Sequence, residues 1–151
     1  MKSTFLTPMD CRYVTPWSFK GVWHENNGVD HWEFISIFQY YSAYLGKTVN
    51  IPAGFRFNKA SVPDLLSINF AGRFTRAAGV HDYLVEHIDR KKADRVFLEA
   101  MRVEIDDEVA AMKEVGVDDD EIAETKCALE GRAQMMYAAV ALATKLSRIF
   151  G

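Results

Sequence analysis

The run His31-Trp-Glu-Phe-Ile-Ser-Ile-Phe-Gln-Tyr-Tyr-Ser-Ala-Tyr44 decides the fold of this chain. It is rich in aromatic and β-branched residues, which favour strands. Side chains alternate between the two faces of a strand, which gives two apolar sets here: Trp32, Phe34, Phe38 and Tyr40, and Ile35, Ile37 and Tyr41. This pattern predicts a strand region with both faces covered.

Strand and turn signals lie on both sides of this run. Asn26-Asn-Gly28 is a turn signal, because Asn and Gly tolerate the positive φ of tight hairpin turns. Residues 19–24 precede it as a strand, and residues 48–51 form a further short strand that Pro52 ends. The N-terminal part therefore predicts an antiparallel sheet of three to five strands.

The periodicity becomes helical after Pro63. Apolar residues at three- and four-residue spacing predict helices over residues 73–87, over residues 90–115 and from residue 118 onward. Asp89 is placed to cap the second helix, Gly116 to end it, and Asp118 with Glu121 to form a capping box for the third. We expect an α+β fold, in which the N-terminal sheet packs against about three C-terminal helices.

Composition sets broad limits. A chain of 151 residues with 49% hydrophobic residues fits one domain over residues 1–151 and argues against disorder. The net charge is -3 and no basic block appears, so nucleic-acid binding is not expected. Residues 1–10 lack the apolar core of a signal peptide, and no run approaches the ~20 apolar residues of a membrane span. Cys11 and Cys127 lie far apart with no CxxC spacing, so either they pair in the fold or both stay reduced, and we expect the reduced state.

The distinctive polar residues lie between Pro52 and Asp94. Residues 51–63 hold two prolines, a glycine, Asn58 and Ser61, and so predict a shaped loop directly after a strand. Such loops often present binding groups. Asn58 and Ser61 are also common turn formers that bond neighbouring backbone groups, so both interpretations stay open.

His81 and Asp82 interrupt an apolar helix. Adjacent helical residues point about 100° apart, so one of the two must sit at the edge of the core stripe or face a cleft. Histidine can serve as base or metal ligand, and a carboxylate can bind a cation or orient the imidazole. A buried histidine bonded to backbone would give the same sequence.

Asp94 is the third candidate. It lies four residues after Arg90, which predicts an ordinary ion pair on one helix face. Alternatively, Asp94 turns inward towards His81 and Asp82 and supplies a third group, the minimum for a catalytic metal site. His81, Asp82 and Asp94 are therefore the candidate catalytic and metal-ligating residues. No GxSxG, P-loop, HExxH, EF-hand or GxGxxG motif is present.

Four motifs in order resemble a known family. They are Val49-Asn-Ile-Pro-Ala-Gly-Phe55, Ala60-Ser-Val-Pro63, Ala77-Ala-Gly-Val-His-Asp-Tyr-Leu84, and Arg90 with Ala93-Asp-Arg-Val-Phe-Leu-Glu-Ala-Met101. The chain resembles an uncharacterised phage and prophage family, domain of unknown function 1353. The positions that match its pattern are Ala60, Ser61, Pro63, His81, Asp82, Tyr83, Arg90 and Asp94. Where that pattern has Thr-Asp, this chain has Phe57-Asn58, so a cation site using that aspartate would lose one charge.

The resemblance implies a phage setting, in the bacterial host cytoplasm or the virion, with other phage proteins as partners. Two functions follow as expectations. The first is a phage-encoded accessory or virion- or tail-associated structural protein, in which the His-Asp-Asp cluster pins the loop to the helices. The second is a small metal-assisted hydrolase with a divalent cation on that cluster. Asn58 favours the first, as does the lack of an identifiable nucleophile.

Both expectations share one geometry. The loop from Asn58 to Ser61 is expected to pack against the helix that carries His81, with Asp94 within bonding reach. Four residues are candidates for binding roles beside this cluster: Asn58, Ser61, Tyr83 and Arg90.

Overall fold

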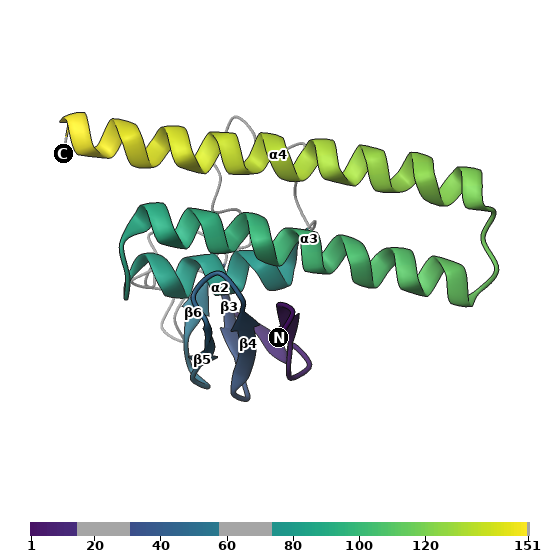
Figure 1. Cartoon of the computed structure of the whole chain (residues 1–151). Helices are drawn as coiled ribbons and strands as arrows, with labels where there is room; N and C mark the ends of the chain where they lie inside the picture. Colours follow the sequence, from purple (N-terminus) through teal and green to yellow (C-terminus); the bar gives the residue numbers. More distant parts are fainter. Residues whose placement is uncertain (15–30, 58–73, 151) are drawn as a thin grey trace.

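The computed structural model describes residues 1–14, 31–57 and 74–150. Short strands make up the N-terminal part and helices the C-terminal part, which confirms the predicted α+β fold (Figure 1). The strands are β1 (Thr4–Phe5), β2 (Cys11–Val14), β3 (His31–Phe34), β4 (Phe38–Ser42), β5 (Lys47–Ile51) and β6 (Arg56–Phe57). The helices are α2 (Thr75–Val85), α3 (Arg90–Glu114) and α4 (Asp119–Phe150).

The strands form two antiparallel sheets of three strands each, in the orders β1-β4-β5 and β2-β3-β6. The aromatic run of residues 31–44 is therefore divided, because β3 and β4 belong to different sheets. Ile35 and Ile37 lie at the break and are 50% and 49% exposed. The prediction that both faces of the run are covered was wrong at these two positions, because the chain leaves one sheet there before it enters the other.

Aromatic packing joins the two sheets to α2. The ring of Phe34 in β3 stacks on Phe38 in β4 and on Phe57 in β6, with ring centroids 5.3 and 4.9 Å apart. Gly79 of α2 lies directly against Phe34, and a Cβ at this position would come within 2.9 Å of Phe34 Cζ. A glycine in mid-helix normally costs stability, so close packing of the helix on the aromatic core explains it here.

Helices α3 and α4 form an antiparallel hairpin, α2 packs along α3, and both α2 and α3 contact the strands (Figure 1). The predicted boundaries are confirmed. The Asp89 side chain accepts from the backbone N–H groups of Lys91 and Lys92, and the Asp118 side chain accepts from that of Asp120. Gly116 ends α3 with a φ of 82°, and the N–H groups of Gly116 and Val117 return to carbonyls of the last helical turn.

Several predictions lie outside the described residues: the turn at residues 26–28, the strand at residues 19–24, and the loop residues Asn58, Ala60, Ser61 and Pro63. Among the helices of the described ranges, none is long and apolar enough to cross a membrane.

Candidate functional site

A hydrogen-bonded pair of buried side chains connects α2 to α3. His81 Nε2 lies 2.8 Å from Asp94 Oδ1, and the two residues are 5% and 2% exposed. Asp94, in the second turn of α3, is buried, whereas Arg90 one turn earlier is exposed. The prediction that Asp94 approaches His81 within bonding reach is confirmed, and the ordinary ion pair with Arg90 is not formed.

Thr144 of α4 completes this cluster. Its hydroxyl Oγ1 donates to Asp94 Oδ2 over 2.7 Å, and the residue is buried. The cluster of His81, Asp94 and Thr144 thus takes one side chain from each helix. Sequence reasoning missed Thr144, although it continues the inward stripe of Met136 and Val140 at four-residue spacing. A single hydroxyl on such an apolar stripe indicates a buried hydrogen bond, and this was the signal in the sequence that could have identified Thr144.

The two nitrogens of His81 have different surroundings. A carboxylate only accepts hydrogen bonds, so Nε2 carries the proton that bonds to Asp94, and Nδ1 is left with a lone pair in the neutral ring. Nδ1 is buried and has no hydrogen-bond partner within the described ranges. Asp82 Oδ1 lies 4.0 Å from it, which is too long for a hydrogen bond. A carboxylate-oriented imidazole of this kind is a suitable base or metal ligand.

The other predicted site residues are spread around the cluster. Asp82 is partly buried beside His81. The ring of Tyr83 meets Phe55 edge-on and stacks on His87, with centroids 5.3 and 4.0 Å apart. Asn58 and Ser61 lie outside the described residues. In the described part of the chain, no group of three or more His, Cys, Asp or Glu residues is arranged to hold a metal ion.

A pocket of about 350 Å³ between α3 and α4 opens onto the cluster. Asp94 and Thr144 line it, and its other lining residues include Tyr137, Lys91 and Lys145. Arg148 at its edge donates to Asp89 over 2.9 Å, an exposed pair that links the two helix ends.

Glu99 of α3 holds a second polar cluster, against the hairpin between β4 and β5. Its Oε1 accepts from Tyr40 Oη over 2.9 Å and from Ser42 Oγ over 2.6 Å, and its Oε2 accepts from the Tyr44 N–H over 2.8 Å. Burial, together with the neighbouring Glu99 carboxylate, raises the pKa of Tyr40 far above its usual value. The shift favours the neutral phenol, which donates the hydrogen bond to Glu99.

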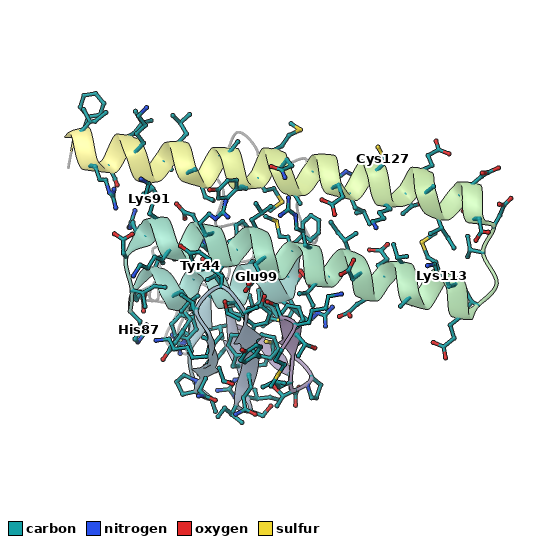
Figure 2. The ribbon with its side chains drawn as sticks, viewed as in Figure 1. Tyr44, His87, Lys91, Glu99, Lys113 and Cys127 are labelled. Carbon is teal, nitrogen blue, oxygen red and sulfur yellow. The ribbon has the colours of Figure 1, made fainter. Side chains whose placement is uncertain are left out.

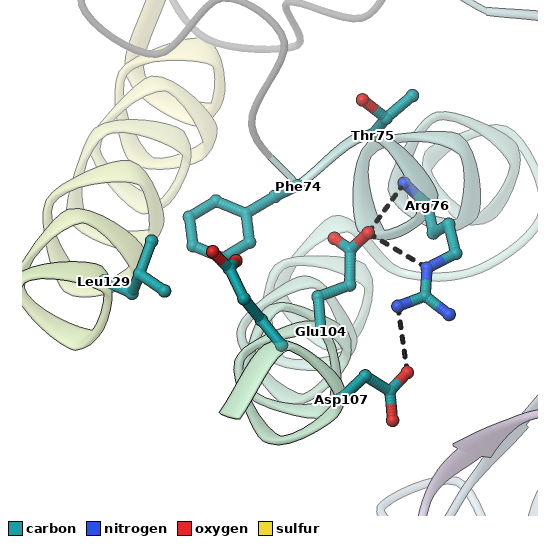
Figure 3. A pocket seen from close by; sticks show the side chains of 7 residues that line it. Phe74, Thr75, Arg76, Glu104, Asp107 and Leu129 are labelled. Carbon is teal, nitrogen blue, oxygen red and sulfur yellow. Dashed lines mark hydrogen bonds and ion pairs between the residues drawn. The ribbon is translucent and has the colours of Figure 1, made fainter. Parts of the chain in front are cut away.

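Glu104 of α3 caps the first turn of α2 (Figure 3). Phe74, at the N-cap of α2, has a left-handed backbone with a φ of 56° and gives no side-chain cap. Glu104 instead accepts from the N–H groups of Arg76 and Ala77 and from Arg76 Nε. Arg76 also donates to Asp107 over 2.9 Å. Burial raises the pKa of Glu104, while Arg76 opposes that shift.

The family described as "Protein of unknown function (DUF1353)" matches residues 32–117. The chain belongs to this family. A comparison with curated proteins found no match, and neither did a comparison with solved structures.

The part of the chain that matches DUF1353 extends from β3 to the loop after α3. It contains His81 and Asp94. It also contains Glu99, which anchors the β4–β5 hairpin to α3, and Glu104, which anchors α2 to α3. Thr144 and the whole of α4 lie beyond it. The third side chain of the buried cluster therefore comes from outside the matched residues.

The buried carboxyl of Glu104 predicts a pH dependence of stability. Because its pKa is raised in the folded state, the unfolded chain ionises first as pH rises, and the free energy of unfolding falls over that range. Glu104→Gln removes this titration. We expect the stability of Glu104→Gln relative to the unmodified protein to improve as the pH rises above the usual pKa of a glutamate, about 4, measured by urea unfolding.

The matched control is Glu114→Gln, at an exposed position near the end of α3. The stability of Glu114→Gln relative to the unmodified protein should stay constant over the same pH range. If the relative stability of Glu104→Gln stayed constant or fell as the pH rose, burial would not raise the pKa of Glu104.

Proposed function

We propose that this DUF1353 protein is a phage-encoded accessory or virion-associated structural protein, in which the cluster of His81, Asp94 and Thr144 fastens three helices together. The observation that carries this proposal is the bonding of Asp94. One of its oxygens bonds to α2 through His81 and the other to α4 through Thr144. Each of the three side chains is buried, as expected of a cluster that specifies how helices pack.

Two features of the sequence support a structural role. Asn58 stands where the family pattern has an aspartate, so the loop offers one negative charge fewer to a cation. No motif of a nucleophilic enzyme class occurs in the chain. The resemblance of the four motifs to phage and prophage proteins supports the phage setting and a location in the host cytoplasm or virion.

A second candidate function, a small metal-assisted hydrolase, is favoured by one observation. His81 Nδ1 is buried without a partner among the described residues, and Asp82 Oδ1 lies 4.0 Å away. In this arrangement Nδ1 and Asp82 would be the ligands of a divalent cation, and Asp94 would orient the imidazole from its other side. Such a cation would lower the pKa of a bound water and supply the attacking hydroxide.

Thermal melting with added metal separates the two functions. Metal that binds only the folded state raises its stability by mass action. We expect the melting temperature to change little with zinc, manganese, magnesium or chelator. His81→Ala should lower it in all of these solutions, because Asp94 then loses a buried hydrogen bond worth about 1–3 kcal/mol. Strong stabilisation by one metal that Asp82→Ala abolishes would instead establish the metal site.

The informative control is Asn58→Asp, which restores the charge of the family pattern. Metal-dependent stabilisation in this variant alone would identify a metal site that the unmodified chain has lost. An unchanged melting temperature for His81→Ala would contradict the structural role of the cluster.

A further inference from the structure

Helix α4 carries apolar residues on two opposite sides. Its inward side holds Ile122, Leu129, Ala133, Met136 and Val140, all buried. Large apolar side chains also occur elsewhere on the helix, and these are 44% to 83% exposed: Met135, Leu142, Leu146, Ile149 and Phe150. A helix with one apolar side needs a single neighbour, whereas a helix with two needs a second one.

Four of these five residues, Met135, Leu142, Leu146 and Ile149, lie on one continuous stripe. Met135, Leu142 and Ile149 are seven residues apart, and residues at this spacing lie on the same side of a helix. Intervening positions at three- and four-residue spacing extend the stripe: Ala128, Gly131, Ala138 and Leu146. Cys127, next to Ala128, points away from α3 (Figure 2). We call residues 128, 131, 135, 138, 142, 146 and 149 the α4 stripe.

Small and large residues are segregated along the α4 stripe. Its first half has Ala128 and Gly131, and its second half has Leu142, Leu146 and Ile149. If a second copy of the helix lies antiparallel, one register sets every large residue opposite a small or flexible one. Its pairs are Ala128 with Ile149, Gly131 with Leu146, Met135 with Leu142, and Ala138 with Ala139. Large residues that fill the space over small ones are the basis of close helix packing.

Charge selects this register over its neighbours. Glu124 lies on the line of the stripe, one turn before Ala128. In the register above, Glu124 lies one turn beyond the pair of Ala128 with Ile149 and opposite no residue of the stripe. A slide of seven residues in one direction would set Glu124 against Leu146, which would bury an unpaired charge. A slide in the other direction would set Leu142 against Leu142 and shorten the contact.

Parallel pairing is disfavoured by the same residues. It would set Glu124 opposite Glu124, and it would bring together the acidic first turns formed by Asp119, Asp120 and Glu121. Antiparallel pairing instead keeps the two acidic first turns at opposite ends of the contact.

We infer that the α4 stripe is a homodimer interface, in which two copies of this chain pair their α4 helices antiparallel about a two-fold axis near residues 138 and 139. The contact extends about 33 Å, or about three heptads, which is the length of a short coiled coil. An interface of this size gives a dimer that dissociates on dilution. Contiguous apolar surface of this kind marks an interaction site.

Light scattering after size-exclusion chromatography, over a series of concentrations of the full chain, tests this interface. The mass should rise with concentration from 17.2 kDa to about twice that value. Leu142→Glu places a charge on the stripe, opposite Met135 of the other copy, and should keep the chain monomeric at every concentration. The matched control Ala143→Glu adds the same charge at the next exposed position, off the stripe, and should still dimerise.

Cysteine cross-linking tests the orientation. In a Cys127→Ser background, Ala138→Cys places two thiols beside the two-fold axis, so oxidised glutathione should give a covalent dimer. The Cys127→Ser variant without Ala138→Cys keeps only Cys11, so it controls for cross-linking through Cys11. A chain that is monomeric at all concentrations, or one whose dimer survives Leu142→Glu, would overturn the interface. A covalent dimer of the unmodified chain through Cys127 would show parallel pairing and overturn the orientation.

Discussion

Asp94→Ala should destabilise this protein more than any other single polar substitution in the described residues. The change removes the acceptor of two buried donors, His81 Nε2 and Thr144 Oγ1. A buried donor without a partner costs about 1–3 kcal/mol, so the free energy of unfolding should fall by roughly 2–5 kcal/mol. For a chain of this length, that loss lowers the melting temperature by roughly 5–15 °C.

Two controls separate burial from charge. Thr144→Val removes one donor and keeps the His81 bond, so it should cost less than half as much. Asp106→Ala removes a carboxylate that pairs with Lys2 at the surface, where an ion pair contributes only about 0–1 kcal/mol. If Asp94→Ala destabilised the fold no more than Asp106→Ala does, the cluster would not fasten the helices.

Glu99→Ala is expected to have the second largest effect. It leaves the buried Tyr40 hydroxyl without its acceptor and removes the bonds from Ser42 and from the Tyr44 N–H. Ser42 Oγ still accepts from the Leu45 N–H, and Tyr44 is exposed to water. The unfolding free energy should therefore fall by about 2–4 kcal/mol, measured by urea unfolding.

Glu99→Gln is the conservative partner of this variant. Its amide oxygen can keep the bonds from Tyr40 and Ser42, but its NH₂ group cannot accept from the Tyr44 N–H. About 1 kcal/mol should be lost. Glu114→Ala, at an exposed position near the end of α3, should change stability by less than about 0.5 kcal/mol. Equal losses for Glu99→Ala and Glu114→Ala would show that Glu99 does not anchor the hairpin.

The sequence by itself determined the helices and their ends. Asp89, Gly116 and Asp118 act on the backbone of their own turns, so their effect is local and readable from residue order. The inward turn of Asp94 was open between two interpretations. Its spacing from Arg90 permits an ion pair, and only packing against His81 excludes it. Family membership followed from motif order, which is also a property of the sequence alone.

The tertiary structure decided how distant segments meet. The aromatic run of residues 31–44 reads as one strand region, but hydrogen bonding to separate partners divides it between two sheets. Thr144 lies 50 residues after Asp94, and Glu104 lies 28 residues after the helix turn that it caps. No spacing rule relates such residues, because their contact depends on how α2, α3 and α4 pack. The exposed side of α4 became apparent only once its buried side had been assigned to α3.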